Sequence, residues 1–195
     1  MEKERITTKM TKRALATSLK KLMNKKALDK ISIREIVEDC GVNRKTFYYH
    51  FTNIYDLLNW MFEEEAIEPV RKYDYLTEYD EVVRFAMNYV EENEHVVSSA
   101  INALGRDELK KFFYNNFIEN MRKIVDDLSK EMVIPEDYKD FLIDFYTDSF
   151  ASLLTNWTHN KDKKDKEKYI EYISITLFEG IRPDLERTHK HFAKK

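Results

Sequence analysis

Residues 32–51 read SIREIVEDCGVNRKTFYYHF, and this stretch predicts two short helices joined by a tight turn. Ser32 and Glu35 have the spacing of a capping box, in which each side chain satisfies a backbone N–H of the first turn. Gly41 follows the first helix and suits the left-handed backbone conformation that ends many helices. Asn43 can cap the second helix. The stretch therefore predicts a helix-turn-helix unit.

The second of these helices is rich in side chains that donate hydrogen bonds. In a major groove, the N-terminal residues of such a helix lie against base edges and its other polar groups contact phosphates. Arg44 can form two hydrogen bonds with guanine, and the methyl group of Thr46 can contact thymine. Phe47 and Phe51 can pack inward. The candidate DNA-binding residues of this helix and its cap are Asn43, Arg44, Lys45, Thr46, Tyr48, Tyr49 and His50.

Charge is divided unevenly along the chain. Residues 1–55 carry 13 lysines and arginines against six aspartates and glutamates, whereas residues 56–195 carry 20 against 30. A basic segment alone is also typical of a solvated helix face, and the tyrosines alone are also typical of packing in a small helical domain. Combined with the capped helix and the glycine turn, a basic head on an acidic body favours a protein that binds nucleic-acid phosphates at one end.

Residues 31–58, with the helix before them, resemble the DNA-binding domain of the tetracycline-repressor (TetR) family. The resemblance rests on the turn Gly41-Val42 and on the run Thr46-Phe-Tyr-Tyr-His-Phe51. It implies an all-helical homodimer that binds double-stranded DNA through two N-terminal heads and has a larger C-terminal body for ligand sensing and dimerisation. Residues 44–60, RKTFYYHFTNIYDLLNW, are most similar to the subgroup that contains the activator of dihydroxyacetone kinase operons.

The resemblance also implies roles for individual residues. The side chains that would face base edges are Arg34, Arg44, Lys45 and Thr46, and those that would bind mainly backbone phosphates are Tyr48, Tyr49 and His50. The family's common lysine near the start of the next helix is Ile54 here, which removes the side chain for that phosphate contact.

The rest of the chain also has a helical pattern. Glycine and proline number three each, too few for the turns of an all-β or a parallel α/β fold. Apolar residues at helical spacing predict helices at 11–26, 79–103, 107–131, 136–159 and 166–181, with a further helix after Asn53 and a short piece after Pro183. We therefore expect an all-α fold with a helix-turn-helix DNA-binding domain at 1–55 and a helical ligand-sensing and dimerisation domain at 56–195.

Several other classes of protein are not expected. No apolar run approaches the roughly 18 residues of a transmembrane helix, so no membrane association is predicted. Cys40 is the only cysteine, which suits a cytoplasmic protein. The sequence lacks a glycine-rich phosphate loop, a nucleophile elbow and Cys/His metal spacing. We therefore expect no catalytic residues, no metal and no cofactor, with a small helical enzyme as a remote alternative.

The second domain is expected to carry the switch, and the sequence leaves its form open. Aromatic residues near 82–117 and 136–159 can line an effector pocket, and the candidates are Phe85, Tyr89, Phe113, Phe117, Phe145 and Trp157. The same residues are also typical of a solid aromatic core. The effector is then a small molecule in the pocket or a partner protein docked on the domain. Repression and activation are both open.

Overall fold

The computed structural model describes residues 2–160 and 165–193, which form helices and turns without strands. The prediction of an all-helical chain is confirmed. The chain forms two compact units. One consists of Met1–Pro69 and Asn93–Gly105, and the other of Val70–Glu92 and Arg106–Lys195. The lysine- and aspartate-rich run at 161–166 is predicted from the sequence to be a solvated connector, and residues 161–164 of it lie outside the described residues.

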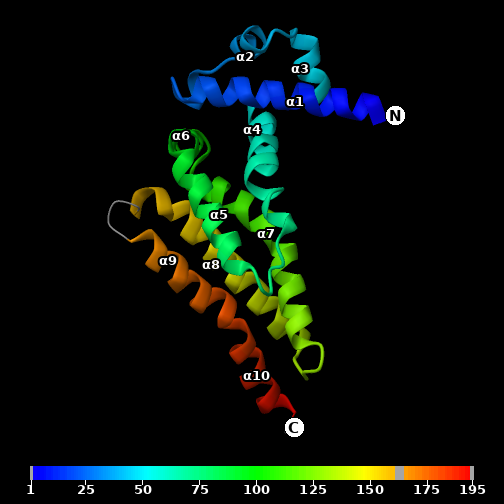
Figure 1. Cartoon of the computed structure of the whole chain (residues 1–195), viewed down its shortest axis with the longest axis vertical. Helices are drawn as coiled ribbons and strands as arrows, with labels where there is room; N and C mark the ends of the chain where they lie inside the picture. The colour runs from blue at the N-terminus through cyan, green and yellow to red at the C-terminus, as the bar shows by residue number, and fades with distance from the viewer. Residues whose placement is uncertain (1, 161–164, 194–195) are drawn as a thin grey trace. The chain divides into compact units, whose positions relative to one another are not determined.

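The first unit is built on one long helix. Its elements are α1 (Glu2–Met23), the 3-10 turn η1 (Leu28–Lys30), α2 (Ile33–Cys40), α3 (Arg44–His50), α4 (Ile54–Phe62), the π-helical turn η2 (Glu63–Ile67) and α6 (Glu94–Leu104). Helices α2 and α3 lie together on one side of α1 (Figure 1). Leu15 and Leu19 of α1, Phe47 of α3, and Leu57 and Leu58 of α4 are fully buried and form its core.

Helix α6 joins this unit although it is distant in sequence. It packs on α1 and on η1. The backbone N–H of Leu28 donates a buried hydrogen bond to Oγ of Ser99 at 2.9 Å. The first unit therefore extends past residue 55, where the sequence places the end of the DNA-binding domain, and it includes a segment of the predicted second domain. The functional division of the chain stays a prediction.

The structure corrects one predicted helix and extends two others. In place of a single helix at 79–103, α5 (Tyr79–Glu92) and α6 are separated by Asn93, whose φ of −112° and ψ of 27° are not helical. Asparagine favours such breaks because its side chain competes for backbone hydrogen bonds. Helix α1 begins at Glu2 rather than near Thr11. Pro183 lies in the first turn of α10, where its missing N–H removes no helical hydrogen bond.

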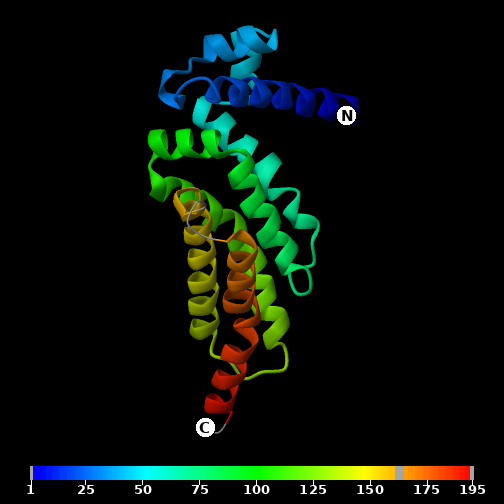
Figure 2. The ribbon, with the colours of Figure 1, turned by 60° about the vertical axis from the view of Figure 1, so that its left-hand side comes forward.

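The second unit is built around an antiparallel helix pair. Its elements are η3 (Val70–Lys72), α5, α7 (Arg106–Ser129), α8 (Glu136–Asn160), α9 (Lys166–Ile173), the π-helical turn η5 (Ser174–Glu179) and α10 (Ile181–Phe192). Helices α7 and α8 run in opposite directions (Figure 2). Polar pairs hold them in register: Lys110 with Asp148, Tyr114 with Asp144, and Arg122 with Asp140.

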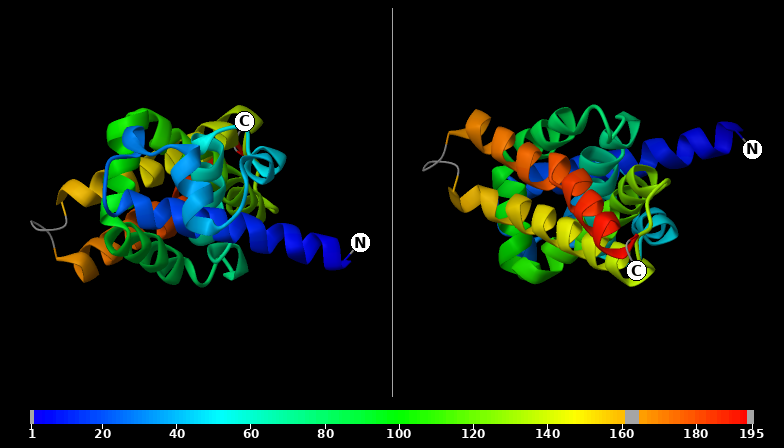
Figure 3. Two further views of the ribbon diagram at one scale, coloured as in Figure 1. Left: turned by 90° about the horizontal axis from the view of Figure 1, so that it is seen from above. Right: turned by 90° about the horizontal axis from the view of Figure 1, so that it is seen from below.

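Aromatic residues fill the core of this unit. The rings of Phe117 and Phe150 meet edge to face with centroids 5.1 Å apart. Buried Trp157 stacks on Tyr169, and its indole N–H donates to Oε1 of Glu91 at 3.0 Å, so the polar end of the buried ring is satisfied. Helices α9 and α10 follow one another along one line through η5, and α8 runs beside them (Figure 3). Within the described residues, no helix has the length and apolar composition needed to cross a membrane.

Candidate nucleic-acid interface

The predicted capping box and glycine turn are both present. Oγ of Ser32 accepts from the backbone N–H of Glu35 at 3.3 Å, and Oε2 of Glu35 accepts from the backbone N–H of Ser32 at 3.0 Å. Hydrogen bonds from Lys26 and then from Ser32 lower the pKa of Glu35 to about 2, so the carboxylate of the capping box stays ionised at neutral pH. Gly41 ends α2 with φ of 72° and ψ of 26°, in the left-handed region.

Gly41→Ala is expected to lower the free energy of unfolding of the first unit by about 1–2 kcal/mol, because a Cβ disfavours the left-handed backbone. Crowding does not contribute, since a Cβ at this position would meet no atom within 4 Å. Gly41→Asn is the matched variant and should cost less, because asparagine tolerates this conformation. Urea unfolding measures the difference. Equal stability of the three proteins would contradict a left-handed requirement at this turn.

Asn43 begins α3 as a cap. Its Oδ1 accepts from the backbone N–H of Thr46 at 2.9 Å and from the Thr46 hydroxyl at 3.2 Å. These bonds fix the start of the helix. They also hold the Thr46 hydroxyl on the cap, so its methyl group is the part that remains suited to a thymine contact. For Asn43, the geometry supports a role in positioning the helix.

Helix α3 separates one buried side from one polar side. Phe47 is fully buried, whereas Arg44, Lys45, Tyr48 and Tyr49 are exposed, with 77% of Tyr49 accessible to solvent. Large aromatic side chains seldom stay this exposed without a partner. The predicted residues of the second motif helix are therefore brought together on one accessible surface, which we call the α3 surface: Arg44, Lys45, Tyr48 and Tyr49.

His50 and Lys12 border this surface. Burial lowers the pKa of His50, and the charge of Lys12 lowers it further. The imidazole is therefore neutral at pH 7 and offers a hydrogen bond rather than a charge. The ammonium of Lys12 lies 5.1 Å from the ring centroid of Phe51 and 5.5 Å from that of Trp60. These cation–π contacts hold it beside the end of α3.

Ion pairs occupy many of the other basic residues of the first unit. Nε of Arg34 lies 2.7 Å from Oε1 of Glu38, so Arg34 must leave this exposed pair to bind a base. Lys9 and Arg13 pair with Glu64, and Lys20 with Glu65. In the part of the chain that the structure describes, Arg44, Lys45 and Lys12 have no carboxylate partner. These three cations lie on or beside the α3 surface.

Two residues of this region were missed by sequence reasoning. Lys12 lies on the basic first helix, and the spacing of apolar residues in that helix does not indicate that Lys12 lies beside α3. Tyr55 is exposed in the first turn of α4, next to Ile54. The sequence feature that could have identified Tyr55 is its place next to Ile54, the position that lacks the family lysine. A tyrosine hydroxyl there can donate a hydrogen bond to a phosphate in place of that lysine.

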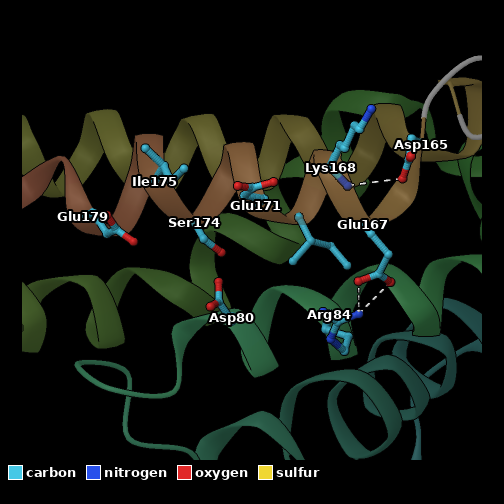
Figure 4. Close-up of a pocket in the computed structure, with 10 residues that line it drawn as sticks. Asp80, Arg84, Asp165, Glu167, Lys168, Glu171, Ser174, Ile175 and Glu179 are labelled. Atoms are coloured by element: carbon cyan, nitrogen blue, oxygen red, sulfur yellow. Dashed lines mark hydrogen bonds and ion pairs between the residues drawn. The ribbon is translucent and has the colours of Figure 1, made fainter.

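The predicted effector-pocket residues do not all lie together. Tyr89, Phe113, Phe117 and Trp157 are buried, and Phe85 is half-buried. Phe145 differs, because 52% of it is exposed on the outer side of α8, where it stacks on Phe141. None of the six lines the groove in Figure 4 or the two pockets beside Tyr75. A pocket at the five inner residues stays a prediction.

Comparisons with known proteins agree with the geometry. The family described as "Transcriptional regulator C-terminal region" matches residues 77–179, and the family described as "Bacterial regulatory proteins, tetR family" matches residues 17–61. The HTH-type dhaKLM operon transcriptional activator DhaS of Lactococcus lactis subsp. lactis (strain IL1403) is 31% identical over 86 residues. That match covers 44% of this chain and 46% of the relative, so it spans about half of the relative's length.

A solved structure is similar over more of the chain. The structure titled dihydroxyacetone kinase operon activator DhaS has a TM-score of 0.69, with 88% of this chain and 96% of that chain covered. Sequence identity over this match is 21%, so the likeness shows a shared fold.

Proposed function

The chain belongs to the TetR family of DNA-binding transcriptional regulators, and we propose that it recognises a palindromic operator as a homodimer switched by an effector on its second unit. The predicted family and the predicted similarity to dihydroxyacetone kinase operon activators are confirmed. One observation supports the DNA contact above all: α3 exposes Arg44, Lys45, Tyr48 and Tyr49 while Phe47 anchors it.

On this proposal, α3 enters the major groove. Arg44 and Lys45 lie in its first turn, which is the part of a recognition helix that reaches base edges. Thr46 presents its methyl group there. Tyr48, Tyr49 and neutral His50 then donate to phosphates and set the depth of the helix. Arg34 takes part once the operator displaces Glu38. Two such heads about 34 Å apart fit successive major grooves.

Arg44→Ala is expected to relax base preference at one position of each half-site, at a cost of about 1–3 kcal/mol in binding free energy. Tyr49→Phe should instead weaken binding to all DNA sequences alike, because it removes a phosphate contact. The measurement is selection of bound fragments from random duplex DNA, followed by titration of the best operator. Arg182→Ala, at an exposed arginine of the second unit, is the matched control. Unchanged affinity and preference in Arg44→Ala would overturn this placement of the recognition helix.

Exposed aromatic rings on α8 support the homodimer. Phe141 and Phe145 are exposed, half-buried Tyr138 continues their row, and adjacent ring centroids are 6.0 Å apart. We call this row the α8 stripe. An exposed row of this kind marks an interaction site, and the same patch on a second copy is a self-complementary partner across a two-fold axis.

The effector is proposed to act through the connection between the units. The chain leaves the second unit at Glu92, forms α6 in the first unit, and returns at Arg106. Helix α6 follows α5 in the chain and packs directly on α1. An effector that prefers one arrangement of α5 can therefore change the position of α6. A small molecule among the buried aromatic residues is one candidate, and a partner protein docked on the second unit is the other.

The sign of regulation and the cellular location follow from the same proposal. The relatives are named as operon activators, so activation is the first outcome to test by fusing the selected operator to a reporter gene. A regulator that binds chromosomal DNA in a bacterium works in the cytoplasm. The role is that of a regulator and not of an enzyme.

A further inference from the structure

The second unit has a groove between α5 on one side and α9 with η5 on the other, and none of the proposed functions uses it. Its volume is about 560 Å³. Figure 4 shows side chains of both helices along it. Its lining residues are Asp80, Arg84, Asp165, Glu167, Lys168, Ile170, Glu171, Ser174, Ile175 and Glu179. Tyr172, the exposed aromatic residue of α9, is not among them, so the groove is distinct from the exposed aromatic surface of that helix.

The groove is acidic, with five carboxylates against two cations. Arg84 already binds Glu167 through both carboxylate oxygens, each at 2.7 Å. Glu179 accepts a hydrogen bond from the Tyr79 hydroxyl at 3.1 Å. Asp80 and Glu171 have no hydrogen bond or ion pair to their side chains within the described residues. Their charges are therefore available to a cationic ligand.

A buried hydroxyl group provides the second observation. Ser174 is only 3% exposed, and its Oγ has no hydrogen-bond partner among the described residues. Its side chain points across the groove toward the helix that carries Asp80 (Figure 4). A buried hydroxyl without a partner lowers stability, and native proteins seldom leave one unless something binds it. Ser174 thus offers an acceptor at the base of an acidic groove.

The spacing of the carboxylates distinguishes an extended cation from a metal ion. In the described part of the chain, no three His, Cys, Asp or Glu side chains are grouped closely enough to hold a metal. Glu171 of α9 and Glu179 of η5 are instead eight positions apart, which is roughly 12 Å at about 1.5 Å per helical residue. Ile170 and Ile175 supply apolar surface to the same groove. Separated charges with apolar surface between them suit methylene chains that join ammonium groups.

We propose that this groove binds a linear polyamine. One ammonium group lies between Asp80 and the Oγ of Ser174, and the others lie against Glu171 and Glu179, with the methylene chain over Ile175. Each ammonium then forms charge-assisted hydrogen bonds with oxygen acceptors. The site does not depend on the DNA-binding role, because all of its residues belong to the second unit.

Isothermal titration of the full-length protein with spermidine at constant ionic strength tests the proposal. Asp80→Asn/Glu171→Gln should bind at least about tenfold more weakly, because it loses two charge-assisted contacts. Glu131→Gln/Glu186→Gln removes the same two charges at exposed positions outside the groove and should bind like the wild type. Equal weakening of both double variants would overturn the proposal, because the binding would then be non-specific attraction to an acidic protein.

Ser174→Ala separates recognition from folding. It should bind spermidine several-fold more weakly while its melting temperature without ligand stays the same or rises, because the lost hydroxyl makes no hydrogen bond in the free protein. Wild-type affinity in Ser174→Ala would overturn the geometry proposed here. Binding of magnesium ion with the affinity of spermidine would also overturn the proposal. So would a groove that binds a lysine-rich peptide but does not bind spermidine.

Discussion

Phe141→Glu/Phe145→Glu is expected to be a folded monomer that binds its operator about 10²–10⁴-fold more weakly than the wild type, because the second head loses the effective concentration that the dimer provides. The physical reason lies in the α8 stripe. Phe141 and Phe145 are 57% and 52% exposed, and glutamates in their place would have to lose their hydration to enter a dimer interface. Light scattering should give a mass near 23.5 kDa, against twice that value for the wild type.

Folding and dimerisation can be separated in this experiment. Since both rings are largely exposed within the single chain, their replacement should leave the helical circular dichroism signal unchanged. Val133→Glu is a matched control, because Val133 is 57% exposed but lies outside the α8 stripe. It should remain a dimer and bind the operator normally. If the double variant stays dimeric at micromolar concentration, the dimer interface does not lie on the α8 stripe.

The same stripe explains where the sequence interpretation of α8 was incomplete. Apolar residues from Tyr138 to Trp157 cover more than one side of the helix, and periodicity alone does not say which side faces the chain's own core. The structure shows which side of α8 is buried and which is exposed. Phe150 and Trp157 are buried, whereas Phe141 and Phe145 face solvent. The prediction that Phe145 lines an inner pocket is therefore wrong, because the spacing of apolar residues along α8 does not indicate which of them stay exposed.

The local signals of the DNA-binding region were read more reliably. A capping box, a glycine turn and an asparagine cap depend on residues at most a few positions apart, so Ser32, Glu35, Gly41 and Asn43 were identified from spacing alone. The placement of α6 depends instead on tertiary contacts. Ser99 and Leu28 are 71 positions apart, and nothing in either local sequence predicts their hydrogen bond.

Counting charges along the sequence also missed the ion pairs of the first unit. Residues 1–55 contain 13 lysines and arginines, but Glu64 and Glu65 lie just beyond this range. They pair with Lys9, Arg13 and Lys20, and acidic residues inside the range pair with Lys21, Lys26 and Arg34. The charge available to DNA is therefore smaller than the count suggests, and the described cations on or beside α3 that have no carboxylate partner are Lys12, Arg44 and Lys45.

Operator affinity is consequently expected to fall about 10³-fold between 50 and 200 mM salt, because three cations from each of two heads lie close to the phosphates and displace roughly six counterions. Electrophoretic mobility or fluorescence anisotropy titrations at several salt concentrations give the slope of log K against log salt. A slope near zero would show that the α3 surface does not meet the phosphate backbone. A slope twice as steep would show that the paired cations of α1 also release their carboxylates on binding.

The variant Lys45→Ala tests whether the α3 surface produces the slope of log K against log salt. Although Lys45 is proposed to face base edges, its charge in the groove lies close to the phosphates and displaces a counterion in each head, so the slope should become shallower by about two for the dimer, at roughly one unit per cation. Lys190→Ala removes an exposed lysine of α10 and should leave the slope unchanged. The two variants have the same net charge, so overall attraction between protein and DNA changes equally in both. A difference between their slopes therefore arises from the position of the Lys45 charge close to the phosphates, and identical slopes would place the charges that displace counterions elsewhere on the first unit.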